Sequence, residues 1–374
     1  MRIGLDARYL SHGLTGGVHT YVLNLATMLP IVAPDDQFVF YADRKAPFEI
    51  DPLPPSVTLR LLPWRSPASS VRNDRQLGRL MDEDDVDVAH HPANYAFRGQ
   101  RPTVVTLHDT LNLFPVARQI AGMARTPGRL GRTLYLAAAT SRTIRRADRI
   151  IAPSEHARQD AAARTGVPLS RIDAVHSAAA ASFAPVTDGE RLNAVRARYR
   201  LPPRMILGDA IKNPRALVEA FRSLPPNLRE GTAIVFFSRE PAPRAELAPL
   251  LAQDVRFTAQ PSTSDLAALY SLAELFVLPS WYEGFGLPLL EAMQCGAPVA
   301  GSTRGSIPEI VGDAGLLFDV DDRAALTRHL SAVLGHADVR RDLAARGLAR
   351  AATFSWERTA RQTLDAYRRA AGGS

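Results

Sequence analysis

The stretch Leu275-Phe-Val-Leu-Pro-Ser-Trp-Tyr-Glu-Gly-Phe-Gly-Leu-Pro-Leu-Leu-Glu-Ala-Met293 joins a strand to a helix through a glycine-containing loop. Its first four residues, Leu275–Leu278, form an apolar run of the length expected for a buried strand. Gly284 and Gly286 permit a tight loop whose backbone can approach a ligand closely. Pro288 suits a first helical turn, where a missing N–H costs nothing. Because the free N–H groups of the helix start point back at the loop, the stretch predicts an anion-binding site.

Two carboxylates, Glu283 and Glu291, are separated by seven residues in this stretch. Glu283 is expected on the loop, and the helical rise of ~1.5 Å per residue puts Glu291 roughly 5–6 Å beyond the helix start. They suit hydroxyl groups on two parts of one extended ligand, such as a sugar and a ribose joined by a diphosphate. A glycoside hydrolase would instead need carboxyl groups about 5–10 Å apart across one bond. The simplest alternative is a helix-capping carboxylate beside a solvated one.

Short apolar segments alternate with helical ones along the rest of the chain. Strands separated by helices of about 10–15 residues indicate parallel sheets with helices on both faces. The expected strands are residues 2–6, 37–41, 57–62, 86–90, 103–107, 149–152, 172–175, 205–207, 233–237, 255–258, 275–278, 298–300 and 315–318. The expected helices are residues 18–29, 132–146, 155–165, 189–199, 214–223, 264–272, 287–294, 307–311, 323–334, 339–351 and 355–370.

The length of 374 residues predicts two domains at roughly 150 residues each. Residues 178–188 are small, turn-rich and without a clear period, so we expect the boundary between residues 180 and 202. The fold class is therefore α/β, with two Rossmann-like doubly wound domains. We expect them to face a cleft at the carboxyl ends of their strands, where such sheets bind ligands.

The net charge of +7 and the pI of about 9.9 raise the question of a nucleic-acid partner. The basic residues are 43 Arg and 2 Lys, spread along the chain, which indicates biased composition and no nucleic-acid partner. In such a chain Lys212 stands out, because a lysine provides a compact ammonium where an arginine is otherwise preferred.

The stretch from Arg118 to Arg149 contains eight arginines and a single acid, Asp148. It is suited to a lipid-linked diphosphate acceptor or to an anionic membrane surface, at ~1 kcal/mol per well-placed cation. The alternative is a solvated helix face in an arginine-biased chain. The chain has no apolar run near the ~18 residues of a membrane span, and its first residues do not have the basic start and long apolar region expected of a signal peptide. A single cysteine, Cys295, excludes an internal disulfide. We therefore expect a cytoplasmic protein with peripheral contact at the inner face of the membrane.

The carboxylate stretch resembles the E-x7-E motif of retaining glycosyltransferases of family 4, which have the two-domain GT-B fold. Four further segments look like motifs of that family and follow in its order along nearly the whole chain. They are Thr15–Val18 before a helix, Thr106–Asp109 at a strand end, Arg146–Ser154, and Ile307–Gly315. The resemblance implies an acceptor-binding domain at residues 1–185 and a donor-binding domain at residues 186–355. It also implies a last helix, residues 356–374, that packs back on the first domain.

The resemblance also implies roles for individual residues. Glu283 would contact the transferred sugar, Glu291 the ribose, and Lys212 the leaving diphosphate. His108 would position the donor sugar beside its anomeric carbon, although a histidine here is also typical of a packed side chain. Glycine backbones would hold the distal phosphate, although Gly16 and Gly17 also suit a simple turn. The implied donor-binding residues are Gly16, Gly17, Ser280, Gly284, Phe285, Gly286, Leu287 and Glu291.

The implied reaction is a front-face displacement that retains the anomeric configuration, in which the leaving phosphate takes the acceptor's proton. It uses no metal ion and no cofactor. The start Asp6-Ala-Arg8 and the Thr-Gly-Gly loop look most like mannosyl- and rhamnosyltransferases, so GDP-mannose is slightly favoured. The acceptor would be a carbohydrate or lipid-linked, in the synthesis of cell-surface polysaccharide or glycoconjugate. The alternative within the same fold is a non-catalytic partner subunit.

Two segments depart from the family pattern. The loop in Ile206–Pro214 is shorter than usual by about two residues and lacks the usual arginine. Its Asp209 would repel a diphosphate unless the carboxylate points away. Residues 177–181 form an alanine-rich run where relatives commonly have Asn-Gly. Both departures predict lower activity or an altered choice of donor.

Overall fold

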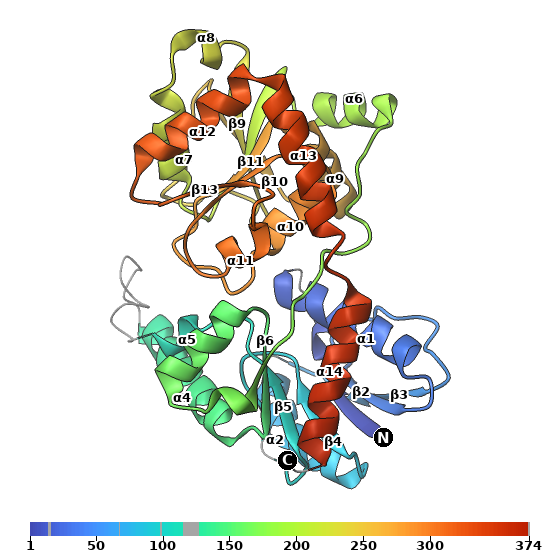
Figure 1. The fold of residues 1–374 in the computed structure, drawn as a ribbon. Coiled ribbons are helices and arrows are strands. Elements are labelled where there is room, and N and C mark those ends of the chain that lie inside the picture. Colours follow the sequence, from blue (N-terminus) through green and yellow to red (C-terminus); the bar gives the residue numbers. More distant parts are fainter. Residues whose placement is uncertain (14–15, 67, 98, 115–126, 373–374) are drawn as a thin grey trace. The chain divides into compact units, whose positions relative to one another are not determined.

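The computed structural model describes residues 1–13, 16–66, 68–97, 99–114 and 127–372, and it divides the chain into two compact units (Figure 1). Unit 1 comprises Met1–Ser177 and Ser355–Ser374, and unit 2 comprises Ala178–Phe354. Each unit is built around one sheet of parallel strands with helices on its faces. The predicted fold class, with two doubly wound α/β domains, is confirmed.

Unit 1 contains a seven-stranded parallel sheet in the order β3-β2-β1-β4-β5-β6-β7. The central strands are buried along almost their whole length, and polar residues on them such as His90 and His91 are buried with the apolar ones. The strands are β1 (Arg2–Asp6), β2 (Gln37–Asp43), β3 (Val57–Leu62), β4 (Val88–His91), β5 (Thr103–Thr106), β6 (Arg149–Ala152) and β7 (Ile172–Ala174). The α-helices are α1 (Gly17–Val32), α2 (Ala68–Glu83), α4 (Pro127–Arg146), α5 (Glu155–Thr165) and α14 (Trp356–Ala371).

The last helix, α14, packs on α1 and on the β4–β6 part of the unit 1 sheet. Ser355 caps its start, because the Ser355 hydroxyl accepts from the Arg358 N–H at 3.2 Å. The Thr359 hydroxyl donates to the carbonyl of His176 at 2.6 Å. The Tyr367 hydroxyl lies 2.7 Å from Nδ1 of the buried His90. Polar contacts as well as apolar packing therefore tie this helix to unit 1.

Unit 2 contains a six-stranded parallel sheet in the order β10-β9-β8-β11-β12-β13. Helices α7 and α12 bury apolar side chains against one face, and α9 and α10 pack against the other. The strands are β8 (Arg204–Asp209), β9 (Thr232–Ser238), β10 (Val255–Ala259), β11 (Leu275–Leu278), β12 (Val299–Ser302) and β13 (Leu316–Phe318). The helices are α6 (Gly189–Arg198), α7 (Pro214–Arg222), α8 (Pro226–Arg229), α9 (Thr263–Leu272), α10 (Leu287–Gln294), α11 (Ile307–Val311), α12 (Arg323–Gly335) and α13 (Ala337–Ala351).

The first division between the units falls at Ser177/Ala178, a few residues before the predicted boundary. The turn-rich stretch that follows is fixed to unit 2. Ala179 and Phe183 lie in its core cluster. The Gln294 amide donates to the carbonyls of Ala180 and Phe183 at 3.2 and 2.6 Å. Residues without a helical or strand period are thus ordered here by tertiary contacts.

One long helix, α2, was not among the predicted elements. Its sequence is mostly polar, and Leu77 and Met81 are its fully buried apolar side chains among those described. Leu80 packs against the same core, so Leu77, Leu80 and Met81 give an i, i+3, i+4 pattern. This pattern is confined to the end of the helix, and the polar residues before it did not indicate where the helix begins.

The arginine-rich stretch is described only in part. Arg118 and Arg125 lie outside the described residues. On α4 the side chains of Arg142, Arg145 and Arg146 are exposed. Arg149 instead forms an ion pair with Asp173, with Nη2 and Oδ1 2.6 Å apart. Of the helices in the described ranges, none combines the length and apolar character that crossing a bilayer requires.

Candidate active site

The strand order of unit 2 reverses between β8 and β11, so the loops after these two strands leave the sheet side by side. In open parallel sheets such a switch point is where ligands bind, outside the carboxyl ends of the strands. The loop after β8 contains Lys212, and the loop after β11 contains Ser280 and Glu283. The topology thus brings together residues that are about seventy positions apart in the chain.

The start of the β11 loop is held by side chains from the neighbouring strands. The Ser302 hydroxyl, at the end of β12, donates to the carbonyl of Ser280 at 2.6 Å. The Asn213 amide, at the start of α7, donates to the carbonyl of Pro279 at 3.2 Å. Ser280 and Ser302 are both buried. The path of the loop is therefore set on both sides before it reaches Glu283.

The backbone of Glu283 is held from the segment before α11. Both the N–H and the hydroxyl of Ser306 donate to the Glu283 carbonyl, at 3.2 and 3.1 Å. Gly305 has φ +63° and lies directly against Glu283. A Cβ atom at Gly305 would come within 2.5 Å of the Glu283 carbonyl oxygen, so only glycine fits.

The loop ends where α10 begins. Gly286 is the N-cap and has φ +97°, a conformation that favours glycine. Pro288 occupies the first turn, as predicted. Leu289 and Leu290 are fully buried and anchor the helix, and Phe285 packs edge-on against Phe354 with the ring centroids 6.0 Å apart. A glycine loop at a helix N-terminus has the backbone geometry that binds anions.

Lys212, Ser280 and Glu283 meet at one carboxylate oxygen. The Lys212 ammonium lies 2.8 Å from Oε1 of Glu283, and the Ser280 hydroxyl donates to the same oxygen at 2.7 Å. The Glu283 side chain is 12% exposed and that of Lys212 is 31% exposed. In this partly buried position the ion pair and the Ser280 hydrogen bond fix the position of the Glu283 carboxylate.

The shortened loop after β8 is folded around Asp209. The Asp209 carboxylate accepts from the N–H of Ile211 at 2.9 Å, and the Asp209 carbonyl accepts from the N–H of Lys212 at 3.3 Å. Burial is the main cause that raises the pKa of Asp209. The carboxylate therefore closes the turn itself, and Lys212, which follows the turn, pairs with Glu283.

Glu291 lies on α10 and is buried, with 3% of its surface exposed. Burial raises the pKa of Glu291 to about 7, against the smaller lowering effects of Arg239 and of the Tyr270 hydrogen bond. The Tyr270 hydroxyl, from α9, donates to Glu291 Oε2 at 3.3 Å. Burial also raises the pKa of Tyr270 well above its usual range, so Tyr270 stays a donor.

The sequence interpretation missed several residues that shape this site: Asp209 as a turn former, and Arg239, Tyr270, Ser302 and Ser306. Arg239 directly follows β9, and its positive charge lowers the pKa of both Asp209 and Glu291. A polar residue at the carboxyl end of each central strand was the available signal for Arg239 and Ser302. The sequence contains no such signal for Tyr270, because a tyrosine within an apolar helix is typical of a core residue.

His108 lies in unit 1, two residues beyond the end of β5. Its ring packs edge-on against Tyr21 of α1, with the centroids 4.9 Å apart. Nε2 lies 2.8 Å from the carbonyl of Pro92, which makes it the protonated nitrogen. Burial lowers the pKa of His108 to about 4, so the ring is neutral at pH 7 and Nδ1 carries the lone pair. A neutral ring is suited to positioning a ligand rather than to protonating one.

Gly16 and Gly17 lie at the start of α1, and Thr15 lies outside the described residues. Gly16 is the N-cap with φ +152°, and the helix begins at Gly17. One turn later the Tyr21 hydroxyl lies 3.1 Å from Oγ1 of Thr106 at the end of β5. The start of α1 and the strand before His108 therefore lie at the same edge of the unit 1 sheet. The predicted site residues thus form two groups, one in each unit.

Two family models match the sequence, one over each unit. Residues 15–180 match the model described as Glycosyltransferase Family 4. Residues 204–336 match the model described as Glycosyl transferases group 1. The two matches leave residues 1–14, 181–203 and 337–374 uncovered.

Relatives include mannosyltransferases of Escherichia coli. The O-antigen chain mannosyltransferase B is 31% identical over 304 residues, which cover 79% of this chain and 77% of that protein. The serotype-specific mannosyltransferase WbdA is 35% identical over 236 residues, or 60% of this chain. The match spans only 29% of the length of WbdA.

Solved structures share the fold at lower sequence identity. Sucrose-phosphate synthase from Thermosynechococcus elongatus has a TM-score of 0.73 and 21% identity, with both chains covered completely. HepE from Anabaena, solved in complex with UDP-glucose, has a TM-score of 0.67 and 17% identity, with 97% of this chain and 98% of that chain covered. At these identities the likeness is one of fold.

Proposed function

Because this chain belongs to the glycosyltransferases of family 4, we propose that it transfers a hexose from a nucleotide sugar to a carbohydrate or lipid-linked acceptor. The observation that carries the proposal is the meeting of Lys212, Ser280 and Glu283 beside a glycine loop and a helix start. We further propose that the anomeric configuration is retained and that no metal ion takes part. The family favours a transferase over the glycoside hydrolase alternative.

In this proposal the donor diphosphate binds at the start of α10. The backbone N–H groups of Gly284, Phe285 and Gly286 face the phosphate, and the helix N-terminus favours its negative charge. The Lys212 ammonium, 2.8 Å from Glu283, provides a compact positive charge on the same side. Charge stabilisation of the leaving group is the main demand of this chemistry, and these groups meet it.

The two carboxylates bind the two ends of the donor. Glu283 accepts hydrogen bonds from hydroxyl groups of the transferred sugar, with Ser280 beside it. Glu291 accepts hydrogen bonds from the ribose, and Leu287 lines the site between them. The contacts of the two residues support these roles. Ser306 holds the backbone of Glu283 at the loop, and the Tyr270 hydroxyl donates to the carboxylate of Glu291. The roles that the resemblance implies for Gly16, Gly17 and His108 stay predictions.

The proposed reaction is a front-face displacement. The bond between the anomeric carbon and the diphosphate oxygen breaks, and the bond to the acceptor oxygen forms on the same face of the sugar. The leaving phosphate oxygen takes the proton of the acceptor hydroxyl, so a protein nucleophile is not needed. Lys212 and the α10 N-terminus stabilise the negative charge that develops on the phosphate.

GDP-mannose is the proposed donor, and a cell-surface polysaccharide or glycoconjugate is the proposed product. Support comes from the names of the relatives, which are a serotype-specific and an O-antigen chain mannosyltransferase. A UDP-sugar is the competing donor, since HepE was solved with UDP-glucose. We also propose that the exposed arginines of α4 contact an anionic membrane surface.

Thermal unfolding in the presence of nucleotides tests the proposal. GDP should raise the unfolding temperature in a saturable manner and more than UDP does, because a ligand that binds only the folded state stabilises it. Glu283→Ala should abolish sugar transfer from GDP-mannose while this shift persists. The absence of a shift with any nucleoside diphosphate would contradict the donor site. A shift without transfer from any donor would instead favour the non-catalytic partner subunit.

A further inference from the structure

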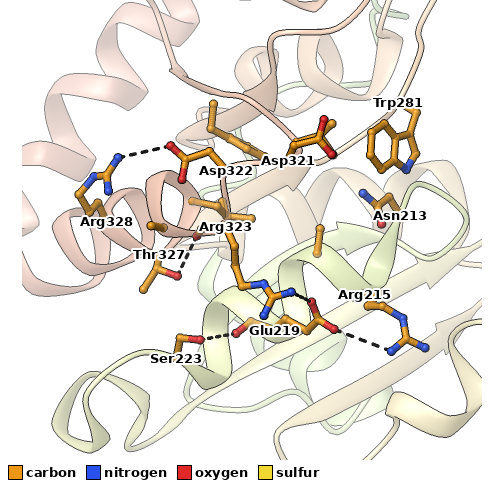
Figure 2. Close-up of a pocket in the computed structure, with 15 residues that line it drawn as sticks. Asn213, Arg215, Glu219, Ser223, Trp281, Asp321, Asp322, Arg323, Thr327 and Arg328 are labelled. Carbon is orange, nitrogen blue, oxygen red and sulfur yellow. Dashed lines mark hydrogen bonds and ion pairs between the residues drawn. The ribbon is translucent and has the colours of Figure 1, made fainter.

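A pocket of about 810 Å³ lies in unit 2 beside the first turns of α7 and α12 (Figure 2). Trp281 and Asn213 lie at one end of it, and Arg328 lies at the other. Its volume falls within the range of small-ligand sites, about 300–1,000 Å³. Asn213 directly follows Lys212, and Trp281 precedes Glu283 by two residues. The pocket therefore adjoins the candidate active site without including its charged residues.

Trp281 is exposed in a way that the fold does not require. Its surface is 57% exposed, although the loop on which it lies is held firmly at Ser280 and Glu283. A tryptophan that merely stabilised the loop would be packed, since a buried indole is worth several kcal/mol. Because Trp281 lines the pocket, its exposed ring offers a flat apolar face that a ligand in the pocket can contact.

The charged side chains of the pocket neutralise one another. Glu219 pairs with Arg323 at 2.6 Å and with Arg215 at 3.8 Å, and Figure 2 shows all three on one wall. Asp322 caps α12 by accepting from the Ala325 N–H at 2.9 Å. With its acids and arginines paired, this wall offers hydrogen-bonding groups without net attraction for a phosphate.

We propose that this pocket of unit 2 binds a neutral sugar ring of an extended acceptor glycan, in addition to the acceptor site that the resemblance places in residues 1–185, with the ring stacked on Trp281. The C–H groups of one sugar face contact the indole, whose faces carry the negative part of the quadrupole. The Asn213 amide nitrogen donates to the carbonyl of Pro279, and the side-chain oxygen of Asn213 provides an acceptor for a sugar hydroxyl. Asp321, which pairs with Arg304 at 2.9 Å, offers a second acceptor. The inference rests on the proposed function and names a subsite for its acceptor.

Tryptophan fluorescence without nucleotide tests the subsite directly. The chain has three tryptophans, and Trp281 is the most exposed of them. Titration with trisaccharides of mannose, rhamnose, glucose and galactose should give a saturable change for at least one of them. Trp281→Ala should abolish this change, and Trp281→Phe, which keeps a smaller ring, should weaken it. The matched control is Trp64→Phe in unit 1, which should preserve the change.

A titration without a saturable change for any of the four trisaccharides would overturn the proposal, and so would a change that survives Trp281→Ala. This titration contains no nucleotide, so neither result bears on nucleotide binding. The thermal shift with nucleotides therefore tests the proposed function separately.

Acceptor length gives a second measurement. The ratio of kcat/KM for a trisaccharide acceptor to that for a monosaccharide should fall about 10-fold in Trp281→Ala, as expected when ~1.4 kcal/mol of binding is lost. The same ratio should be unchanged in Trp64→Phe. An unchanged ratio in Trp281→Ala would show that the pocket does not bind the acceptor.

Discussion

Glu291 is the residue whose chemistry depends most on its surroundings. Its burial raises the pKa from 4.5 to about 7. The folded chain therefore binds more protons than the unfolded chain between these two pH values. This carboxyl therefore lowers the unfolding free energy as the pH rises from about 4.5 to about 7. Above pH 7 the loss of unfolding free energy has reached its full size.

Glu291→Gln should therefore stabilise the ligand-free fold at about pH 8, because the amide keeps the shape without the buried charge. The expected gain in unfolding free energy is on the order of 3 kcal/mol, and it should vanish near about pH 4.5. Denaturant unfolding at several pH values measures it, with exposed Glu190→Gln on α6 as the control. A gain that is independent of pH would contradict this account. The same variant should bind GDP more weakly, since the ribose loses its charged acceptor.

At the scale of elements, the β11 loop depends on the close contact between Gly305 and Glu283. Gly305→Ala should lower the unfolding free energy by about 1–2 kcal/mol for the left-handed backbone and by about 1–3 kcal/mol more for the clash. It should also reduce transfer strongly, because the clash displaces Glu283. Gly166→Ala is the matched control, since Gly166 has φ +72° with open space around its Cβ position.

Gly166→Ala should lower the unfolding free energy by the cost of the left-handed backbone alone, and it should leave the rate of sugar transfer unchanged. Equal losses of stability and of transfer in the two variants would show that the clash has no effect.

Helix α4 carries the prediction on membranes. Its exposed Arg142, Arg145 and Arg146 should make the protein co-sediment with anionic liposomes, and the binding should fall as the salt concentration rises. Replacing all three by Gln should weaken the binding, whereas Arg149→Gln should have little effect because Arg149 is paired with Asp173. Equal binding to neutral liposomes would contradict an electrostatic contact.

At the scale of the whole molecule, the proposed transfer relies on Lys212 and a helix N-terminus for phosphate charge. EDTA should therefore leave the rate of sugar transfer unchanged, because these groups supply the positive charge that a metal ion supplies elsewhere. The rate should be measured before and after dialysis against EDTA, with and without added Mg²⁺ or Mn²⁺. A loss of transfer that either ion restores would refute metal independence.

The order of strands and helices was readable from the sequence because it depends on local patterns. The apolar run of β11, the glycines of the following loop and Pro288 each indicate their own structure within a few residues. The strand order, which places the β8 and β11 loops side by side, was not predicted and came only from the structure. Glu283 could be identified in advance from its motif, together with the loop that holds it.

The contacts between residues far apart in the sequence were decided by the tertiary structure alone. Three examples leave no periodic signal in the chain. The Tyr270 hydroxyl donates to Glu291, the Asp209 carboxylate accepts within its own loop, and Trp281 is exposed in the pocket beside α12. Helix α2 was missed for a different reason, since its apolar pattern is confined to Leu77, Leu80 and Met81 near its end and the preceding residues are mostly polar. Spacing along the chain specifies which face a residue occupies. Burial, pKa and exposure depend on which elements become neighbours, and that is settled only when the chain packs.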